Sequence, residues 1–221
     1  MTVEFFDCDQ RSEQWYELRA GLPTASEFAS ILAKGEGKMR RSYMLRLAGE
    51  RVRGIPAASY ENAYMIRGRE QEAEAREEYA FIADVEPKLV GFARDLDKGA
   101  GCSPDALIGD DGVLEIKTAE PHILIDLMLK GTFPGEHRAQ CQGALWVTGR
   151  EWVDLAVYCP RLPLFMKRAY RDEAYIGELA SAVKRFNEET DEIVERIRRY
   201  GEPAREVVKR DLERSLTMMA G

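Results

Sequence analysis

The stretch Ser103-Pro-Asp-Ala-Leu-Ile-Gly-Asp-Asp-Gly-Val-Leu-Glu-Ile-Lys117 decides how this chain folds. It predicts a β-hairpin, because apolar runs lie on both sides of Gly109–Gly112, which has the composition of a turn. If the chain folds about a loop centred near Asp110, Asp105 lies opposite Glu115 to within one residue of register. The hairpin therefore brings carboxylates from two strands together.

Alternation along the second strand adds an ammonium group to this pair. Successive side chains of a strand point to opposite faces, so Glu115 and Lys117 share a face and Ile116 points into a core. The Ile116 carbonyl stays in the strand and can still reach a site at its edge. Carboxylate oxygens are ligands that Mg²⁺ prefers, usually one or two of them with waters. A lysine beside the metal can orient or activate a water and balance the charge of a phosphate being cleaved.

The composition narrows the chemistry that is available. The 221 residues include only two histidines, which disfavours histidine-rich metal sites and Ser-His-Asp triads. The four cysteines are scattered without a Cys-x-x-Cys pair, which predicts reduced and mostly buried thiols. The sequence has neither a phosphate-binding Gly-x-x-x-x-Gly-Lys-Ser/Thr loop nor an apolar run that could cross a membrane. We therefore expect a cytoplasmic protein whose acid–base chemistry, if it is an enzyme, uses carboxylates, lysine or metal-bound water.

The charge is uneven along the chain. The net charge of −7 argues against a generic nucleic-acid-binding protein, which is usually basic. Residues 34–53 nevertheless carry seven basic and two acidic side chains, a local charge of +5. This region could bind phosphates, although charge runs are more often solvated helix faces.

The pattern of apolar residues predicts helices on both sides of the hairpin. Expected helices cover residues 12–20, 24–32, 39–53, 61–83, 122–130, 135–148 and 172–199. Expected strands besides the hairpin cover residues 88–93, 152–158 and 164–169. We expect an α/β fold in which one mixed central sheet is flanked by helices. It would form a single domain over residues 1–200, followed by a helical tail over 201–221.

The start of the second helix has the pattern of an anion site. Thr24 and Glu27 match a capping box, so Thr24 should open this helix. The first turn of a helix presents free N–H groups and a partial positive charge, and Arg19 and Ser26 lie close by in the sequence. Plain helix capping is the alternative explanation.

Four segments of the chain stand in a characteristic order. They are Leu18-Arg-Ala-Gly-Leu-Pro-Thr-Ala-Ser-Glu27, Gly68-Arg-Glu-Gln-Glu-Ala-Glu-Ala75, the hairpin with Pro104-Asp105 and Glu115-Ile116-Lys117, and Ala139-Gln-Cys-Gln-Gly-Ala-Leu-Trp-Val-Thr148. The hairpin alone could be an ordinary one with a solvated Glu and Lys. Together the segments resemble the phage lambda exonuclease family, also called YqaJ-type viral recombinases, over roughly residues 10–170. This resemblance implies the PD-(D/E)XK, restriction-endonuclease-like nuclease fold.

The resemblance also implies an activity and partners. It implies an alkaline-exonuclease-type, 5′→3′ deoxyribonuclease that uses two Mg²⁺ ions, with Mn²⁺ as a substitute. Such an enzyme releases 5′ mononucleotides from linear double-stranded DNA ends and leaves 3′ single-stranded overhangs for recombination by single-strand annealing. The implied partners are a single-strand annealing protein and two further copies of the chain in a homotrimeric ring. The implied setting is a bacterial host cell, with the protein encoded by a phage or prophage.

Residue roles follow from the same resemblance, position by position. The implied metal ligands are Asp105, Glu115 and the Ile116 carbonyl. Three further residues are implied to assist these ligands. Lys117 would orient or activate the water, Glu72 would line the metal site, and Gln140 would lie beside it. The neighbouring carboxylates should raise the lysine pKa, so we favour a water-positioning role for this lysine over a role as a free base.

Further positions carry less defined roles. The residues implied to hold the 5′-terminal phosphate are Arg19, Thr24 and Ser26. Three additional candidates follow from the resemblance. Asp95 matches an acidic family position, and Met65 matches an apolar wedge that splits the terminal base pair. Gln142 is the second glutamine of the Gln-x-Gln helix.

Two other functions remain open from the sequence. The first is a PD-(D/E)XK endonuclease or nickase, which would cut circular duplex DNA. The second is a catalytically inactive scaffold that binds DNA ends, against which the intact Asp105, Glu115 and Lys117 argue.

Overall fold

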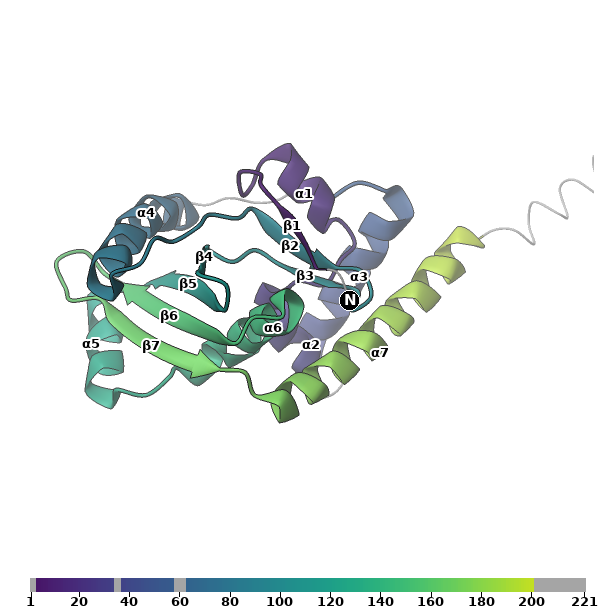
Figure 1. The fold of residues 1–221 in the computed structure, drawn as a ribbon. Helices are drawn as coiled ribbons and strands as arrows, with labels where there is room; N and C mark the ends of the chain where they lie inside the picture. Colours follow the sequence, from purple (N-terminus) through teal and green to yellow (C-terminus); the bar gives the residue numbers. More distant parts are fainter. Residues whose placement is uncertain (1–2, 34–36, 58–62, 201–221) are drawn as a thin grey trace, which may run out of the picture.

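The computed structural model describes residues 3–33, 37–57 and 63–200, with the backbone alone for residues 63–70. The helices are α1 (Glu13–Arg19), α2 (Phe28–Leu32), α3 (Lys38–Arg53), α4 (Ala63–Ala83), α5 (Pro121–Lys130), α6 (Arg138–Thr148) and α7 (Glu173–Arg198) (Figure 1). Short 3₁₀ turns, η1 (Ala25–Glu27) and η2 (Gly135–His137), precede α2 and α6. The helical tail expected over 201–221 lies outside the described residues.

The strands form two sheets, so the expectation of a single mixed sheet was wrong. One sheet has the order β1-β2-β3, from β1 (Glu4–Phe6), β2 (Phe92–Asp95) and β3 (Ala100–Cys102). The other has the order β4-β5-β6-β7, from β4 (Ala106–Ile108), β5 (Gly112–Thr118), β6 (Trp152–Tyr158) and β7 (Phe165–Tyr170). Only the β5–β6 pair is parallel; β4–β5 and β6–β7 are antiparallel. The sequence pattern indicates strands but not their partners, and the short β1 was missed.

Strand β2 lies further along the chain than expected. The expected strand covered residues 88–93, whereas β2 covers Phe92–Asp95, so the charged residues Arg94 and Asp95 belong to the strand. Arg94 donates to the Glu4 carboxylate of β1 at 2.7 Å, and Asp95 pairs with Lys98 at 2.7 Å. Because both charges find partners, they are compatible with a buried strand.

The β4–β5 hairpin confirms the expected register. Ala106 pairs with Leu114, and the Asp105 N–H donates to the Leu114 carbonyl at 3.2 Å, which places Asp105 opposite Glu115. Arg150 fixes the turn, because its guanidinium donates to the carbonyls of Gly109 at 2.9 Å and Gly112 at 2.8 Å.

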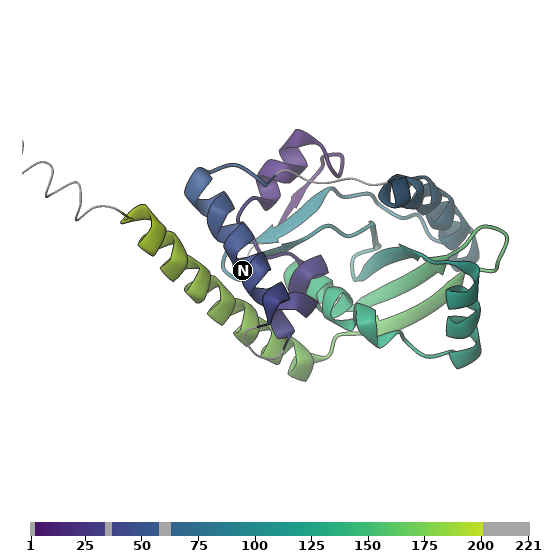
Figure 2. The same cartoon turned by 180° about the vertical axis from the view of Figure 1, so that it is seen from behind.

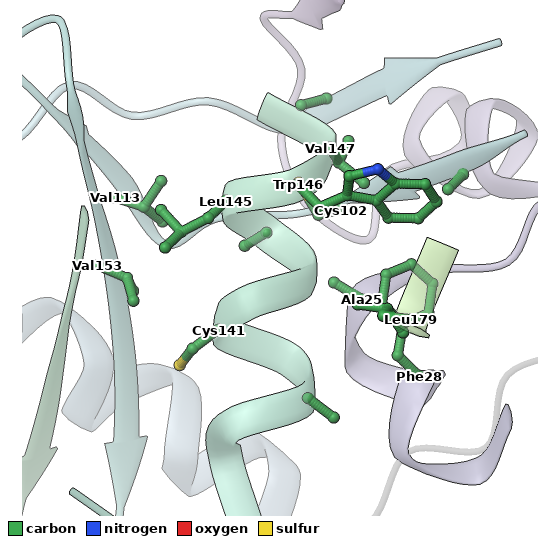
Figure 3. Packing of buried hydrophobic residues seen from close by; sticks show 14 of the residues in the cluster. Ala25, Phe28, Cys102, Val113, Cys141, Leu145, Trp146, Val147, Val153 and Leu179 are labelled. Carbon is green, nitrogen blue, oxygen red and sulfur yellow. The ribbon is translucent and has the colours of Figure 1, made fainter. Parts of the chain in front are cut away.

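Helix α6 forms the centre of the core. Figure 3 shows Val113 and Val153 of the four-stranded sheet on one side of this helix, and Phe28 and Leu179 of α2 and α7 on the other. The helix also contacts β2 and β3, so it joins the two sheets. Gly143 allows the close approach of α2, since a Cβ there would lie 2.3 Å from the Phe28 ring. The opposite face of the four-stranded sheet is covered by α4 (Figure 1).

Helix α7 lies alongside α3, as the reverse view shows (Figure 2). Arg40 pairs with Glu189 at 2.7 Å and Arg51 with Asp191 at 2.8 Å. Part of the basic stretch considered for phosphate binding is therefore neutralised within the fold.

Two expectations from composition can be compared with the structure. The four cysteines, Cys8, Cys102, Cys141 and Cys159, are free, and all but Cys8 are buried. Among the helices of the described ranges, none has the length and apolar character needed to cross a membrane.

Candidate active site

The hairpin, α1, η1 and α6 enclose a cavity of about 380 Å³. Most of the residues singled out from the sequence line it: Arg19, Ser26, Glu72, Asp105, Glu115, Ile116, Lys117 and Gln140. Segments far apart in the sequence thus converge on one volume.

The carboxylates of the cavity are held in defined positions. An Asp105 carboxylate oxygen, Oδ2, accepts a hydrogen bond from the Ile116 N–H at 2.5 Å. Glu115 is 3% exposed, and its Oε1 accepts from Lys117 Nζ at 2.7 Å and from the Gln140 side-chain amide. Strand alternation brings Glu115 and Lys117 together on one face of β5. The tertiary structure adds Gln140, which comes from α6.

Asp105 lies in an unfavourable electrostatic environment. Burial, and after it the negative charges of Glu115 and Glu72, raise the pKa of Asp105 well above its usual range. The Lys117 ammonium and the Ile116 N–H offset this only in part. The protein's own groups therefore leave negative charge around Asp105 incompletely compensated.

Lys117 remains a cation in this environment. Burial by itself lowers the pKa of Lys117, but the charges of Glu115 and Asp105 outweigh burial and raise it above its ordinary value. A lysine with a raised pKa is a poor general base at neutral pH and a good fixed positive charge.

The donor atoms of the cavity fit a hard divalent cation. Asp105, Glu115 and the Ile116 carbonyl supply oxygen ligands, and a cation would compensate the repulsion around Asp105. Within the described ranges, no three or more His, Cys, Asp or Glu side chains are close enough to hold a metal by themselves. Mg²⁺ needs no such set, because it usually binds one or two carboxylates and keeps several waters.

A second group of side chains surrounds Arg19. Its guanidinium lies 4.0 Å from the centre of the Trp15 ring and donates to Ser103 Oγ at 3.1 Å and Thr24 Oγ1 at 3.4 Å. The hydroxyls of Thr24 and Ser26 are 3.4 Å apart. The structure thus brings together the three residues expected to hold a phosphate.

Trp15 and Ser103 are members of this group that the sequence analysis did not single out. The Trp15 indole N–H donates to Ser103 Oγ at 2.9 Å, so the two residues hold each other beside Arg19. The available signal was the position of Ser103 directly before Pro104-Asp105 and of Trp15 one helical turn before Arg19.

The expected capping box at Thr24 was wrong. Thr24 makes no side-chain capping hydrogen bond, and the following residues form the 3₁₀ turn η1 before α2 begins at Phe28. The Thr24 hydroxyl contacts Arg19 and Ser26, while Glu27 pairs with Arg46 at 2.9 Å. Any phosphate site here therefore depends on side chains more than on a helix N-terminus.

Asp95 and Gln142 do not belong to the cavity. Asp95 lies in β2, 1% exposed, and pairs with Lys98, whose ammonium also donates to the Trp146 carbonyl at 2.9 Å. Gln142 donates to the Tyr170 carbonyl at 2.8 Å and so ties α6 to the end of β7. Residues two apart on a helix point about 200° apart, so Gln140 and Gln142 cannot share the site.

The other two candidates lie on α4. Glu72 lines the cavity and pairs with Arg76 at 3.3 Å. Met65 belongs to the part of α4 whose side chains lie outside the described residues.

Comparison with known proteins adds a family and solved relatives. Residues 14–151 match the YqaJ-like viral recombinase domain. The chain is similar to an alkaline exonuclease (LHK-Exo) from Laribacter hongkongensis, with 33% identity over 87% of this chain and 100% of that chain and a TM-score of 0.79. The LHK-Exo complex with dAMP matches at the same identity and coverage, with a TM-score of 0.80. No curated protein matches.

A more distant structure supports the fold alone. A phage-related exonuclease from Haemophilus somnus 129PT is 14% identical, with a TM-score of 0.55 over 79% of this chain and 96% of that chain. The α/β fold expected from the hairpin is therefore confirmed as that of phage-related exonucleases, with the PD-(D/E)XK type of core.

Proposed function

The chain belongs to the YqaJ-like viral recombinase family, and we propose that it is a Mg²⁺-dependent exonuclease that degrades linear duplex DNA in the 5′→3′ direction. The observation that carries this proposal is the convergence of Asp105, Glu115 and Lys117 in one cavity that also contains Arg19. The cavity combines oxygen ligands for a metal with cationic groups for phosphate.

The chain's own residues have separate tasks in this proposal. Asp105, Glu115 and the Ile116 carbonyl would hold two Mg²⁺ ions, for which Mn²⁺ would substitute, while Glu72 adds negative charge. When bound, the metal would supply an activated water and would stabilise the leaving oxygen. Lys117 is protonated, so it orients that water and balances charge on the phosphate. Gln140 keeps Glu115 in place through its side-chain hydrogen bond.

Recognition of the DNA end is assigned to the group around Arg19. Arg19, Thr24 and Ser26 would bind the 5′-terminal phosphate, because a guanidinium and hydroxyl groups suit phosphate oxygens. Arg19 and Ser26 share the cavity with the carboxylates, which suits a substrate with one nucleotide between the terminal and the scissile phosphates. We therefore expect the enzyme to release 5′ mononucleotides.

The remaining parts of the proposal concern assembly and setting. A homotrimeric ring would keep the enzyme on its DNA, and a single-strand annealing protein would receive the 3′ strand. The protein would act in the host cytoplasm, where its DNA substrate lies.

Digestion of a defined duplex tests this function. The substrate is linear DNA with one 5′-phosphorylated end and a label at the 3′ end of the opposite strand, incubated with Mg²⁺ or with EDTA beside a relaxed circle. We expect 5′ mononucleotides only with Mg²⁺, survival of the labelled strand and an intact circle.

The variants Lys117→Ala and Lys130→Ala separate catalysis from general charge. Lys130 is an exposed lysine of α5 that pairs with Asp126 at 2.5 Å, so its loss should leave digestion unchanged. Loss of Lys117 should abolish it. Cutting of the circle would instead identify an endonuclease, and end binding without cleavage would identify an inactive scaffold.

A further inference from the structure

A second cavity, of about 580 Å³, adjoins the catalytic one. Both cavities are lined by Trp15, Arg19, Ser26 and Lys117. Of these two cavities, the first alone is lined by Asp105 and Glu115, and the second alone by Thr24, Glu27, Tyr43 and Arg46. The second cavity therefore lies on the far side of the Arg19 group from the carboxylates.

A second arginine is held in this cavity. Arg46 donates to Glu27 Oε1 at 2.9 Å, and its guanidinium carbon lies 4.9 Å from the centre of the Tyr43 ring. The Arg46 and Glu27 side chains are 48% and 35% exposed, so solvent reaches both partners. Ion pairs of this kind are weak, and a competing anion can replace the carboxylate.

Phosphate is the anion that suits this position. A guanidinium binds two phosphate oxygens in the same planar geometry with which it binds a carboxylate. Glu27 engages Arg46 through one oxygen, Oε1, while its Oε2 accepts from the Ser30 hydroxyl at 3.3 Å, so a phosphate could bind the guanidinium through two oxygens where Glu27 uses one. Burial chiefly lowers the pKa of Arg19, and the nearby Arg46 charge adds to this effect. Both arginines line the second cavity, so a phosphate that enters it meets two guanidinium groups.

The geometry points to a second phosphate subsite at Arg46, beyond the site of the 5′-terminal phosphate, from which an incoming phosphate displaces Glu27. This inference rests on the proposed function, because it takes the Arg19 group as the holder of the phosphate next to the scissile nucleotide. Its ligand is a phosphate placed further in the 5′ direction. Two substrate ends supply one: a 5′-triphosphate, and a 5′-phosphorylated overhang that is one nucleotide longer.

Another arginine of α3, Arg40, provides a control. Arg40 is on the same helix and also pairs with a glutamate, Glu189, at 2.7 Å, but it lines neither of the two cavities. Arg40→Ala removes the same charge, together with an ion pair of two hydrogen bonds, without touching the subsite.

Single-turnover cleavage of three duplexes tests the inference. They share one sequence and carry a blunt 5′-monophosphate, a blunt 5′-triphosphate or a 5′-phosphorylated one-nucleotide overhang, with the other end closed by a hairpin loop. The measured quantity is the first-cleavage rate on each extended end divided by the rate on the monophosphate end. Wild type is compared with Arg46→Ala, Glu27→Gln and Arg40→Ala.

Arg46→Ala should lower this ratio about tenfold, as expected for the loss of a charge-assisted contact. Glu27→Gln should raise the ratio, because a neutral amide competes less well for Arg46, and Arg40→Ala should match wild type. A response of the triphosphate end alone identifies a polyphosphate subsite, and a response of the overhang alone identifies a nucleotide subsite.

An unchanged ratio in Arg46→Ala, with the melting temperature of the variant preserved, overturns the subsite and leaves the proposed function standing. A wild-type protein that cannot degrade the monophosphate duplex overturns both. Equal losses in Arg46→Ala and Arg40→Ala mean general electrostatics and also overturn the subsite.

Discussion

Two buried carboxylates on neighbouring strands differ in how completely the protein's own hydrogen-bond donors satisfy them. Glu115 of β5 is 3% exposed and Asp154 of β6 is 7% exposed. The parallel register pairs Asp154 with Leu114, so Glu115 and Asp154 point to opposite faces of one sheet. Glu115 faces the catalytic cavity, and Asp154 faces the side covered by α4.

The Asp154 carboxylate is fully engaged by donors. It accepts from the Tyr79 hydroxyl at 2.7 Å and from Arg168 Nε and Nη2, each at 2.8 Å. Arg168 in turn lies 3.6 Å from the centre of the Trp152 ring. This network is closed, so its role is to fix β6 and β7 against α4.

The Glu115 carboxylate belongs to an incomplete network. Lys117 and Gln140 satisfy one of its oxygens, but Asp105 lies opposite with a raised pKa caused by burial and by the charges of Glu115 and Glu72. A buried carboxylate with complementary donors can stabilise a fold. Carboxylates that repel each other beside a cavity instead indicate a site for a bound cation. Burial of Asp154 therefore serves the stability of the fold, whereas burial of Glu115 serves the chemistry of the cavity.

Among variants of these two carboxylates, the largest effect should come from Glu115→Gln, which removes the charge of a proposed metal ligand and keeps the side-chain shape. We expect the cleavage rate of phosphorylated duplex to fall about 1,000-fold, equivalent to about 4 kcal/mol of barrier. The matched change on the other face, Asp154→Asn, should leave the rate within about threefold of wild type, since no reacting group contacts it. Similar losses of cleavage rate in both variants would contradict the assignment of Glu115 to the chemistry and of Asp154 to the fold.

A smaller effect is expected from Asp154→Ala, on stability. The change leaves the buried Tyr79 hydroxyl without its acceptor and frees Arg168, which is partly exposed and can turn to water. We expect the free energy of unfolding to fall by about 2 kcal/mol. Denaturant titration measures this, with Asp126→Ala as the exposed control that should change little. Equal destabilisation by both variants would show that the Asp154 network is an ordinary surface pair.

The smallest effect should come from Asp105→Asn in metal-free protein. The pKa of Asp105 is raised in the fold, so its protonated form stabilises the protein at acidic pH and this contribution is lost as the pH rises. Asparagine removes the repulsion from Glu115 across the strand pair, which should stabilise the protein by up to about 1 kcal/mol at neutral pH.

Melting curves in EDTA and in Mg²⁺ measure this last effect. Wild type should gain stability on addition of Mg²⁺, whereas Asp105→Asn should gain less because it lacks a ligand charge. A wild-type melting temperature that millimolar Mg²⁺ leaves unchanged would contradict the uncompensated charge that we ascribe to this face.

Much of the chemistry was predictable from local sequence. The hairpin fixes Asp105, Glu115, Ile116 and Lys117 through turn position and strand alternation, and both rules act over a few residues. The helices α3, α6 and α7 follow from apolar periodicity for the same reason. These features depend on neighbours along the chain.

The tertiary structure decided which distant groups complete or leave the site. It brought Ser103 to Trp15 and Arg19, tied Gln142 to the Tyr170 carbonyl, and placed Lys98, the partner of Asp95, against the Trp146 carbonyl. It also divided the strands into two sheets and paired Arg40 of the basic stretch with α7. These outcomes depend on strand pairing and helix packing between segments far apart in sequence, and local patterns carry no information about such partners.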